Sequence, residues 1–302
     1  MKGLMGQSNR QANRQGRSAG PVLLVLMFTL LALAACSSPT PQLTGNAAIY
    51  ENGKEMFGRG RFDKAIEITE DLAAKSPADA TIEKARVLRV VILSGELNAY
   101  KDAAEAYEKG ADATKNPHFQ AAYRTNRGNA FQTASARALG LGDTAKQIMD
   151  GGGFDKDFIL DAPYPATEGP LDVAAYQKVR GGEWVEPEDQ DAAMVDGERK
   201  GIDDALAALI GDRAKARDAL KAGPVTLKGL DFAFYVANEL VIGASVFDKK
   251  HSENPPKLRA LEGEADQIAK AIQATLKANP NPDYDKKLKK LDDQLKTTLK
   301  NI

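Results

Sequence analysis

Long stretches of the chain after residue 46 carry apolar side chains every three or four residues, the spacing of one face of an α-helix. These stretches are rich in alanine, interrupted by glutamate, lysine, aspartate and arginine. Alanine favours helices, and aromatic residues, which favour strands, make up only 6% of the chain. We therefore predict an all-α protein rather than a β-sandwich.

The beginning of the chain has the pattern of an export signal. Basic residues occur from Lys2 to Arg17 without any acidic residue among them. The apolar run Pro21–Ala35 follows, and it is shorter than the about 20 residues that a transmembrane helix needs. A basic segment followed by a short apolar run is typical of a secretory signal peptide. We expect residues 1–35 to be such a signal; the alternative is an uncleaved signal anchor.

The only cysteine of the chain ends the run Leu33-Ala34-Ala35-Cys36. This run resembles the lipobox of bacterial lipoproteins, in which the cysteine sulfur is joined to diacylglycerol. The resemblance implies cleavage before Cys36 and a lipid anchor in the cell envelope. Residues 36–45 would then be the lipidated cysteine and a flexible tether rich in serine, threonine and proline. By the same resemblance, Ser37 favours the outer membrane, facing the periplasm, over the inner membrane.

The region 46–149 contains a repeat pattern. Its first part resembles a tetratricopeptide repeat, and weaker matches follow at Tyr100–Tyr107 and at Tyr123–Phe131. The second match lies further along than the usual about 34 residues, which predicts an expanded turn near Ser94–Asn98. The resemblance implies helices that stack into an α-solenoid with a concave face. The residues of the first match are Tyr50, Gly53, Phe57, Gly60, Phe62, Ala65, Ile66, Leu72 and Pro77.

Glycine and proline are frequent in residues 150–187, which excludes a long helix there. This segment is either an irregular connector or a functional loop that exposes Phe154, Tyr164 and Trp184 as aromatic anchors. Residues 188–302 return to the helical pattern and predict a C-terminal helical bundle around an apolar helix at 229–248. The last helix carries a narrow leucine seam that favours packing on its own domain over dimerisation. The oligomeric state stays open.

No motif in the chain indicates catalysis. The two histidines do not have metal-ligand spacing, and neither a phosphate-binding loop nor a nucleophile elbow is present. We therefore predict a protein that is not an enzyme and that uses no cofactor and no metal. The formal net charge of −1 gives no basic bias, so we expect no nucleic-acid partner.

These features predict a membrane-anchored lipoprotein that serves as a binding or scaffold protein for a protein or peptide partner in cell-envelope assembly or maintenance. The alternative, also implied by resemblance, is an accessory component of a TRAP-type solute-uptake system that holds a small molecule in a cavity between helices. An open groove with exposed aromatic residues would favour the first function, and a deep apolar cavity would favour the second. The predicted partner-binding residues are Tyr50, Glu51, Lys54, Phe57, Thr125, Asn126, Asn129 and Trp184.

The lipid anchor can be tested by metabolic labelling with a fatty-acid analogue. We expect the wild-type protein to be labelled and the Cys36→Ala variant to remain unlabelled, because residue 36 carries the only thiol of the chain. Equal labelling of the two proteins would contradict the anchor.

Overall fold

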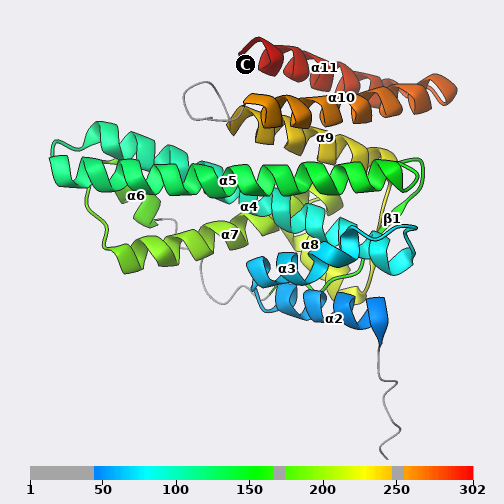
Figure 1. Ribbon diagram of the computed structural model, residues 1–302, viewed down its shortest axis with the longest axis horizontal. Helices are drawn as coiled ribbons and strands as arrows, with labels where there is room; N and C mark the ends of the chain where they lie inside the picture. The colour runs from blue at the N-terminus through cyan, green and yellow to red at the C-terminus, as the bar shows by residue number, and fades with distance from the viewer. Residues whose placement is uncertain (1–43, 166–173, 247–254, 302) are drawn as a thin grey trace, which may run out of the picture. The chain divides into compact units, whose positions relative to one another are not determined.

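The computed structural model describes residues 44–165, 174–246 and 255–301. The predicted signal peptide, Cys36 and nearly all of the predicted tether lie outside these residues. From Thr44 onward the chain forms one compact unit of packed helices with a single two-stranded sheet among its described residues (Figure 1). The all-α prediction is confirmed in this coarse form. The elements are α2 (Gly45–Gly58), α3 (Phe62–Ala73), α4 (Ala80–Ala113), α5 (Pro117–Asp150), β1 (Phe158–Leu160), α6 (Ala174–Arg180), α7 (Pro187–Ile210), α8 (Arg213–Ala222), β2 (Val225–Leu227), α9 (Gly229–Val246), α10 (Pro255–Ala278) and α11 (Pro282–Asn301).

The hairpin of α2 and α3 depends on two glycines. Gly60 lies in the turn with a φ of +69°, a left-handed conformation that glycine adopts without steric cost. A Cβ atom on Gly53 would lie 2.6 Å from the methyl group of Thr69, so glycine permits the close approach of α2 to α3. Phe57 and Phe62 are buried next to the turn, with ring centroids 5.7 Å apart. The first predicted pair of helices is thus confirmed.

Helix α4 differs from the prediction for the following stretch. The turn predicted near Ser94–Asn98 is wrong, because these residues lie in the middle of a single helix of 34 residues. The Ser94 hydroxyl donates to the Val90 carbonyl within this helix, and residues 85–97 are all buried. A helical hairpin and a continuous helix share the same apolar period, so the sequence pattern did not distinguish them. The third predicted repeat helix is likewise the first part of α5, which also has 34 residues.

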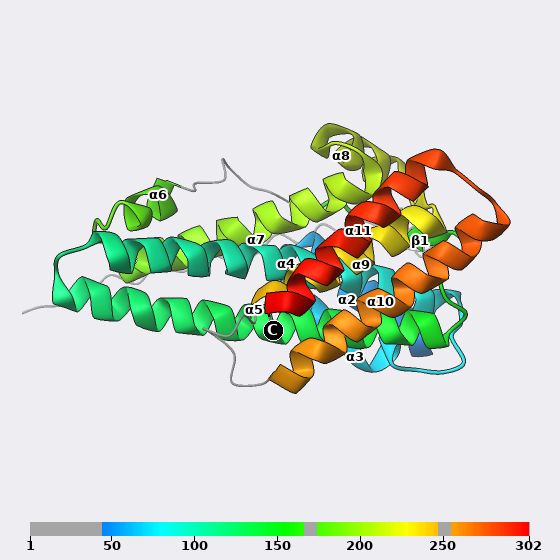
Figure 2. The ribbon, with the colours of Figure 1, turned by 90° about the horizontal axis from the view of Figure 1, so that it is seen from above.

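Helix α4 is the central element of the compact unit, since α3, α5, α6, α7, α9 and β1 pack against it (Figure 2). Its crossing with α7 brings Gly95 against Gly201. A Cβ atom on Gly95 would lie 2.8 Å from the backbone nitrogen of Ile202, and a Cβ atom on Gly201 would overlap the carbonyl oxygen of Gly95. The two backbones therefore approach each other more closely than any larger side chain would allow.

The C-terminal helices form a layer over α5, in which α9 lies beneath α10 and α11 (Figures 1 and 2). Among the described residues, α9 is the helix that is long and apolar enough to cross a membrane, but 67% of its residues are buried inside the protein. It is the central helix of this region, as predicted. The leucines of the predicted seam, Leu288, Leu291 and Leu295, are buried where α11 packs on α9 and α10.

The segment between α5 and α7 contains no long helix in its described part, as its glycines and prolines predict. Its strand β1 pairs antiparallel with β2, with Ile159 opposite Thr226. Phe154 and Phe158 are buried against Phe232 of α9, with ring centroids 5.9 and 4.9 Å from it. The alternative in which Phe154 is an exposed anchor is therefore wrong, because this part of the connector packs into the core.

The glycine crossing predicts opposite effects for two Gly→Ala substitutions. Gly201→Ala should lower the free energy of unfolding by about 1–3 kcal/mol, because the added methyl group forces α7 away from α4. Gly128→Ala on α5 is the control, since a Cβ atom there meets nothing within 4 Å. It should raise the free energy of unfolding by about 0.5–1 kcal/mol through helix propensity alone. Urea denaturation followed by circular dichroism measures both, and equal stability of the two variants would contradict the close crossing.

Candidate functional site

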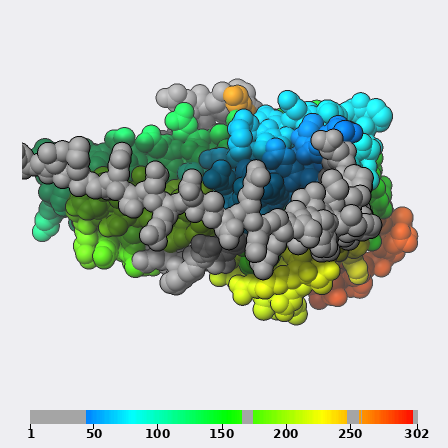
Figure 3. All heavy atoms as spheres, turned by 90° about the horizontal axis from the view of Figure 1, so that it is seen from below, coloured from blue at the N-terminus to red at the C-terminus, as the bar shows by residue number. Residues whose placement is uncertain are grey.

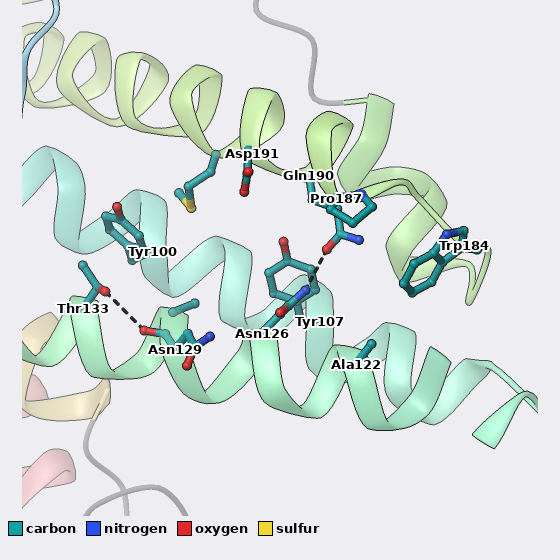
Figure 4. Close-up of a pocket in the computed structure, with 12 residues that line it drawn as sticks. Tyr100, Tyr107, Ala122, Asn126, Asn129, Thr133, Trp184, Pro187, Gln190 and Asp191 are labelled. Atoms are coloured by element: carbon teal, nitrogen blue, oxygen red, sulfur yellow. Dashed lines mark hydrogen bonds between the residues drawn. The ribbon is translucent and has the colours of Figure 1, made fainter. Parts of the chain in front are cut away.

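The candidate site is a cleft of about 370 Å³ bounded by α4, α5 and the first half of α7 (Figure 4). Each helix contributes one face, because the lining residues recur at helical spacing along it. Trp184, in the segment that leads into α7, closes one end. The lining residues are Tyr100, Tyr107, Ala122, Asn126, Asn129, Ala130, Thr133, Trp184, Pro187, Gln190, Asp191 and Met194.

Two amide side chains are held in fixed orientation across the cleft. The Asn126 Nδ2 group of α5 donates to Gln190 Oε1 of α7 over 2.8 Å. The Gln190 Nε2 group donates in turn to the Val185 carbonyl over 2.6 Å. Asn129 lies one turn further along α5, is exposed, and its side-chain amide has no hydrogen bond to another described residue. Its donor and acceptor groups are therefore free to meet a ligand.

Aromatic rings form the rest of the wall. Trp184 is half-buried and stacks on Phe119 and Tyr123, with ring centroids 4.8 and 6.0 Å apart. The Tyr123 hydroxyl donates to the Glu183 carbonyl and fixes the segment that carries the tryptophan. Burial and the negative charge of Asp191 raise the pKa of Tyr107 to about 12, so its hydroxyl stays protonated at neutral pH. The rings thus present a rigid surface rather than mobile side chains.

A cluster of charged residues lies between α3, α4, α5 and α7, next to the Tyr100 end of the cleft. The Tyr100 hydroxyl donates to Glu198 Oε1 over 2.6 Å. Arg137 of α5 forms ion pairs with Glu96 of α4 and with Asp63 of α3. The Glu96 side chain is only 1% exposed, and burial raises the pKa of its carboxyl group against the opposing effect of Arg137. This cluster connects the four helices and holds the Tyr100 ring in place.

The sequence reasoning did not find this cluster. Its members are far apart in the chain, and their proximity follows from the packing of long helices. One signal was present, because Glu96 is a charged residue within an otherwise apolar part of α4. A charge in such a run is costly to bury without a partner, so it predicts a buried ion pair.

A second buried carboxyl group lies outside the cleft. Glu239 of α9 accepts a hydrogen bond from Asn98 Nδ2 over 2.8 Å, and burial raises the pKa of its carboxyl group to about 7. The neighbouring Asn238 donates to the Phe234 carbonyl over 2.7 Å. Both polar side chains are therefore satisfied within the core, which agrees with a structural role.

Two of the four predicted binding residues of α2 are buried and do not face a groove. Tyr50 and Phe57 are buried, and the Tyr50 hydroxyl donates to the Asp161 carbonyl over 2.6 Å. Lys54 forms ion pairs with Glu51 at 3.2 Å and with Asp161 at 2.9 Å. The prediction of a groove face for Tyr50 and Phe57 is wrong, because Tyr50 is bonded to the chain after β1 and Phe57 packs against Phe62 in the core. Glu51 and Lys54 line a hollow of about 330 Å³ beside the chain after β1. The blue and cyan surface of the α2–α3 hairpin lies on the face shown in Figure 3.

Three of the predicted binding residues of α5 and the connector line the cleft. Asn126, Asn129 and Trp184 come together in the cleft, as described above. Thr125 is exposed outside it, and its hydroxyl donates to the Ala121 carbonyl within α5. Tyr164 is half-buried and donates to Asp203 Oδ1 over 2.9 Å, so it is not a free anchor. Sequence reasoning missed the partners of the three cleft residues on α4 and α7.

A larger hollow of about 630 Å³ lies between α9 and α11. It has Val241 and Ile242 as its apolar floor, and exposed lysines of α11 form its edge. No aromatic residue and no pair of bonded amides is among the residues that line it. The cleft beside Trp184 is the more specific site, because its polar groups are fixed by hydrogen bonds.

The described residues contain no group of three or more His, Cys, Asp or Glu side chains that could hold a metal ion. Comparison of the chain with protein-family models, with curated proteins and with solved structures finds no match.

Proposed function

We propose that the chain is a lipid-anchored binding protein of the bacterial cell envelope, attached through Cys36 to the outer membrane and facing the periplasm. The lipobox resemblance and the signal-like first 35 residues support this placement. The α2–α3 hairpin is its one tetratricopeptide-like unit, and the geometry at Gly53 and Gly60 supports that assignment. The long helices α4 and α5 extend this hairpin into the body that carries the cleft.

The cleft beside Trp184 binds an extended segment of a protein or peptide partner. The observation that carries this function is the combination of free and fixed amide side chains with aromatic rings on opposing helices. Asparagine and glutamine amides offer both a donor and an acceptor, as a peptide backbone does, so they can pair with an extended chain at any sequence. Aromatic rings contribute a large contact area at a small entropic cost. The protein then acts as a scaffold in envelope assembly or maintenance.

A small solute is the second candidate occupant. The volume of about 370 Å³ lies in the range of small-molecule sites, which supports an accessory role in solute uptake. The cleft is less consistent with this function, because a solute site is enclosed whereas Asn129 and Asp191 are exposed. Native mass spectrometry of the purified protein would reveal a retained small molecule.

Affinity purification from detergent-solubilised envelopes tests the peptide function. We expect Asn129→Ala to reduce recovery of the partner, since the variant removes an amide that is free to pair with a ligand, a contribution of about 1 kcal/mol or roughly fivefold in affinity. Its thermal stability should not change, because Asn129 is exposed.

Asn52→Ala is the matched control. Asn52 is also an exposed helical asparagine, but it lies on α2 and lines neither the cleft nor the hollow beside the chain after β1. Recovery of the partner should equal that of the wild type. If Asn129→Ala and Asn52→Ala recover every partner equally well, the cleft is not the binding site.

A further inference from the structure

The cleft carries one charge, and that charge has no partner. Asp191 is the only charged residue among those that line the cleft, and its carboxylate points from α7 toward the space above the two tyrosines of α4 (Figure 4). The side chain is exposed and forms no ion pair with another residue in the described parts of the chain. A ligand in the cleft would therefore meet an uncompensated negative charge.

The approach to the cleft along α7 is acidic as well. No lysine or arginine occurs from Glu183 to Glu198, whereas Glu186, Glu188 and Asp189 precede Asp191 and are exposed. Glu188 and Asp189 lie in the first turn of α7, where acidic side chains stabilise the positive end of the helix dipole. Asp191 lies beyond that turn, so helix stability does not account for it.

The cations on the surrounding helices do not line the cleft. On α5, Arg127 is 3.8 Å from Glu108, and on α4, Lys101 is 2.9 Å from Glu105. Arg124 lies two residues from Asn126, which places it on the opposite side of α5 from the cleft. On α6, Lys178 lines a neighbouring hollow together with Glu186 and Asp189, so it offsets part of the charge at the start of α7 but does not line the cleft that Asp191 lines.

The aromatic wall suits the same kind of ligand. The rings of Tyr100, Tyr107 and Trp184 all line the cleft that Asp191 enters. Aromatic rings attract cations through the negative charge of their faces, and they also pack against the aliphatic stems of lysine and arginine. The Tyr100 ring is held by the bond from its hydroxyl to Glu198, so it offers a preformed surface.

We propose that the segment bound in this cleft is cationic, an inference that rests on the peptide-binding function proposed above. A lysine or arginine side chain of an extended peptide places its charge next to Asp191 and its stem against Tyr100 and Tyr107. The backbone beside that residue pairs with the side-chain amide of Asn129. The exposed acidic side chains at the start of α7 attract basic segments before they enter the cleft.

Calorimetric titration of the full-length lipidated protein in neutral detergent tests the proposal. The probes are three unstructured heptapeptides of equal length in which the central three residues are lysine, glutamine or glutamate. We expect the lysine peptide to bind at least tenfold more tightly than the glutamine peptide and the glutamate peptide to bind most weakly. The fluorescence of Trp184, the only tryptophan, should change on binding, because its ring lines the cleft.

Two isosteric variants separate the cleft charge from the charge of the whole surface. Asp191→Asn should reduce the lysine-over-glutamine preference to less than threefold. Glu188→Gln removes the same charge from the same helix outside the cleft, and it should keep most of the preference. Circular dichroism should show the same unfolding temperature for all three proteins within about 2 °C, since both side chains are exposed.

Each outcome decides one claim. If the glutamine or glutamate peptide binds as tightly as the lysine peptide, the cationic specificity is wrong and peptide binding stands. If Glu188→Gln loses as much preference as Asp191→Asn, the assignment of the preference to Asp191 in the cleft is wrong. If none of the three peptides binds, peptide binding in this cleft is wrong and the specificity falls with it.

Discussion

The close crossing of α4 and α7 at Gly95 and Gly201 determines where every other part of the cleft lies. Because the two backbones touch there, α7 leaves α4 at a fixed point, and its first half diverges to leave the space that Trp184 closes. Glu198 lies one turn before the crossing and reaches Tyr100. Asp191 lies two turns further toward the start of α7, where it lines the open part of the cleft. A larger residue at either glycine would move this whole wall of the cleft.

The charged cluster beside the crossing fixes the third wall. Arg137 brings α5 to Glu96 of α4 and Asp63 of α3, so that Asn126 and Asn129 of α5 face Gln190 and Asp191 of α7. Truncating one member of such a cluster leaves a buried charge without a partner, which costs more than the pair contributes to stability. The cleft is therefore built on two short-range constraints: one of backbone contact and one of charge pairing. This rigidity suits a site that binds an extended segment without rearranging.

Local features of the fold followed from the sequence, whereas features that depend on distant contacts did not. The first helical pair, the apolar helix at 229–248 and the leucine seam of α11 depend on neighbours within a few residues, and they were predicted. The prediction of a turn near Ser94–Asn98 was wrong, because the apolar period is the same in a continuous helix and in two helices joined by a turn. Asn126, Asn129 and Trp184 were predicted as binding residues one by one. Their partners on α4 and α7 were missed, since only tertiary packing joins those helices. The prediction that Tyr50 and Phe57 line a groove was wrong, because Tyr50 is bonded to the chain at Asp161 and Phe57 packs against Phe62.

The central claim is that the partner enters the cleft between α4, α5 and α7. Hydrogen exchange of the full-length protein, measured by mass spectrometry with and without the lysine heptapeptide, tests this claim most directly. We predict slower exchange of backbone amides in residues 122–133 and 181–194, and unchanged exchange elsewhere. Slower exchange confined to α2, or to the hollow between α9 and α11, would contradict the account.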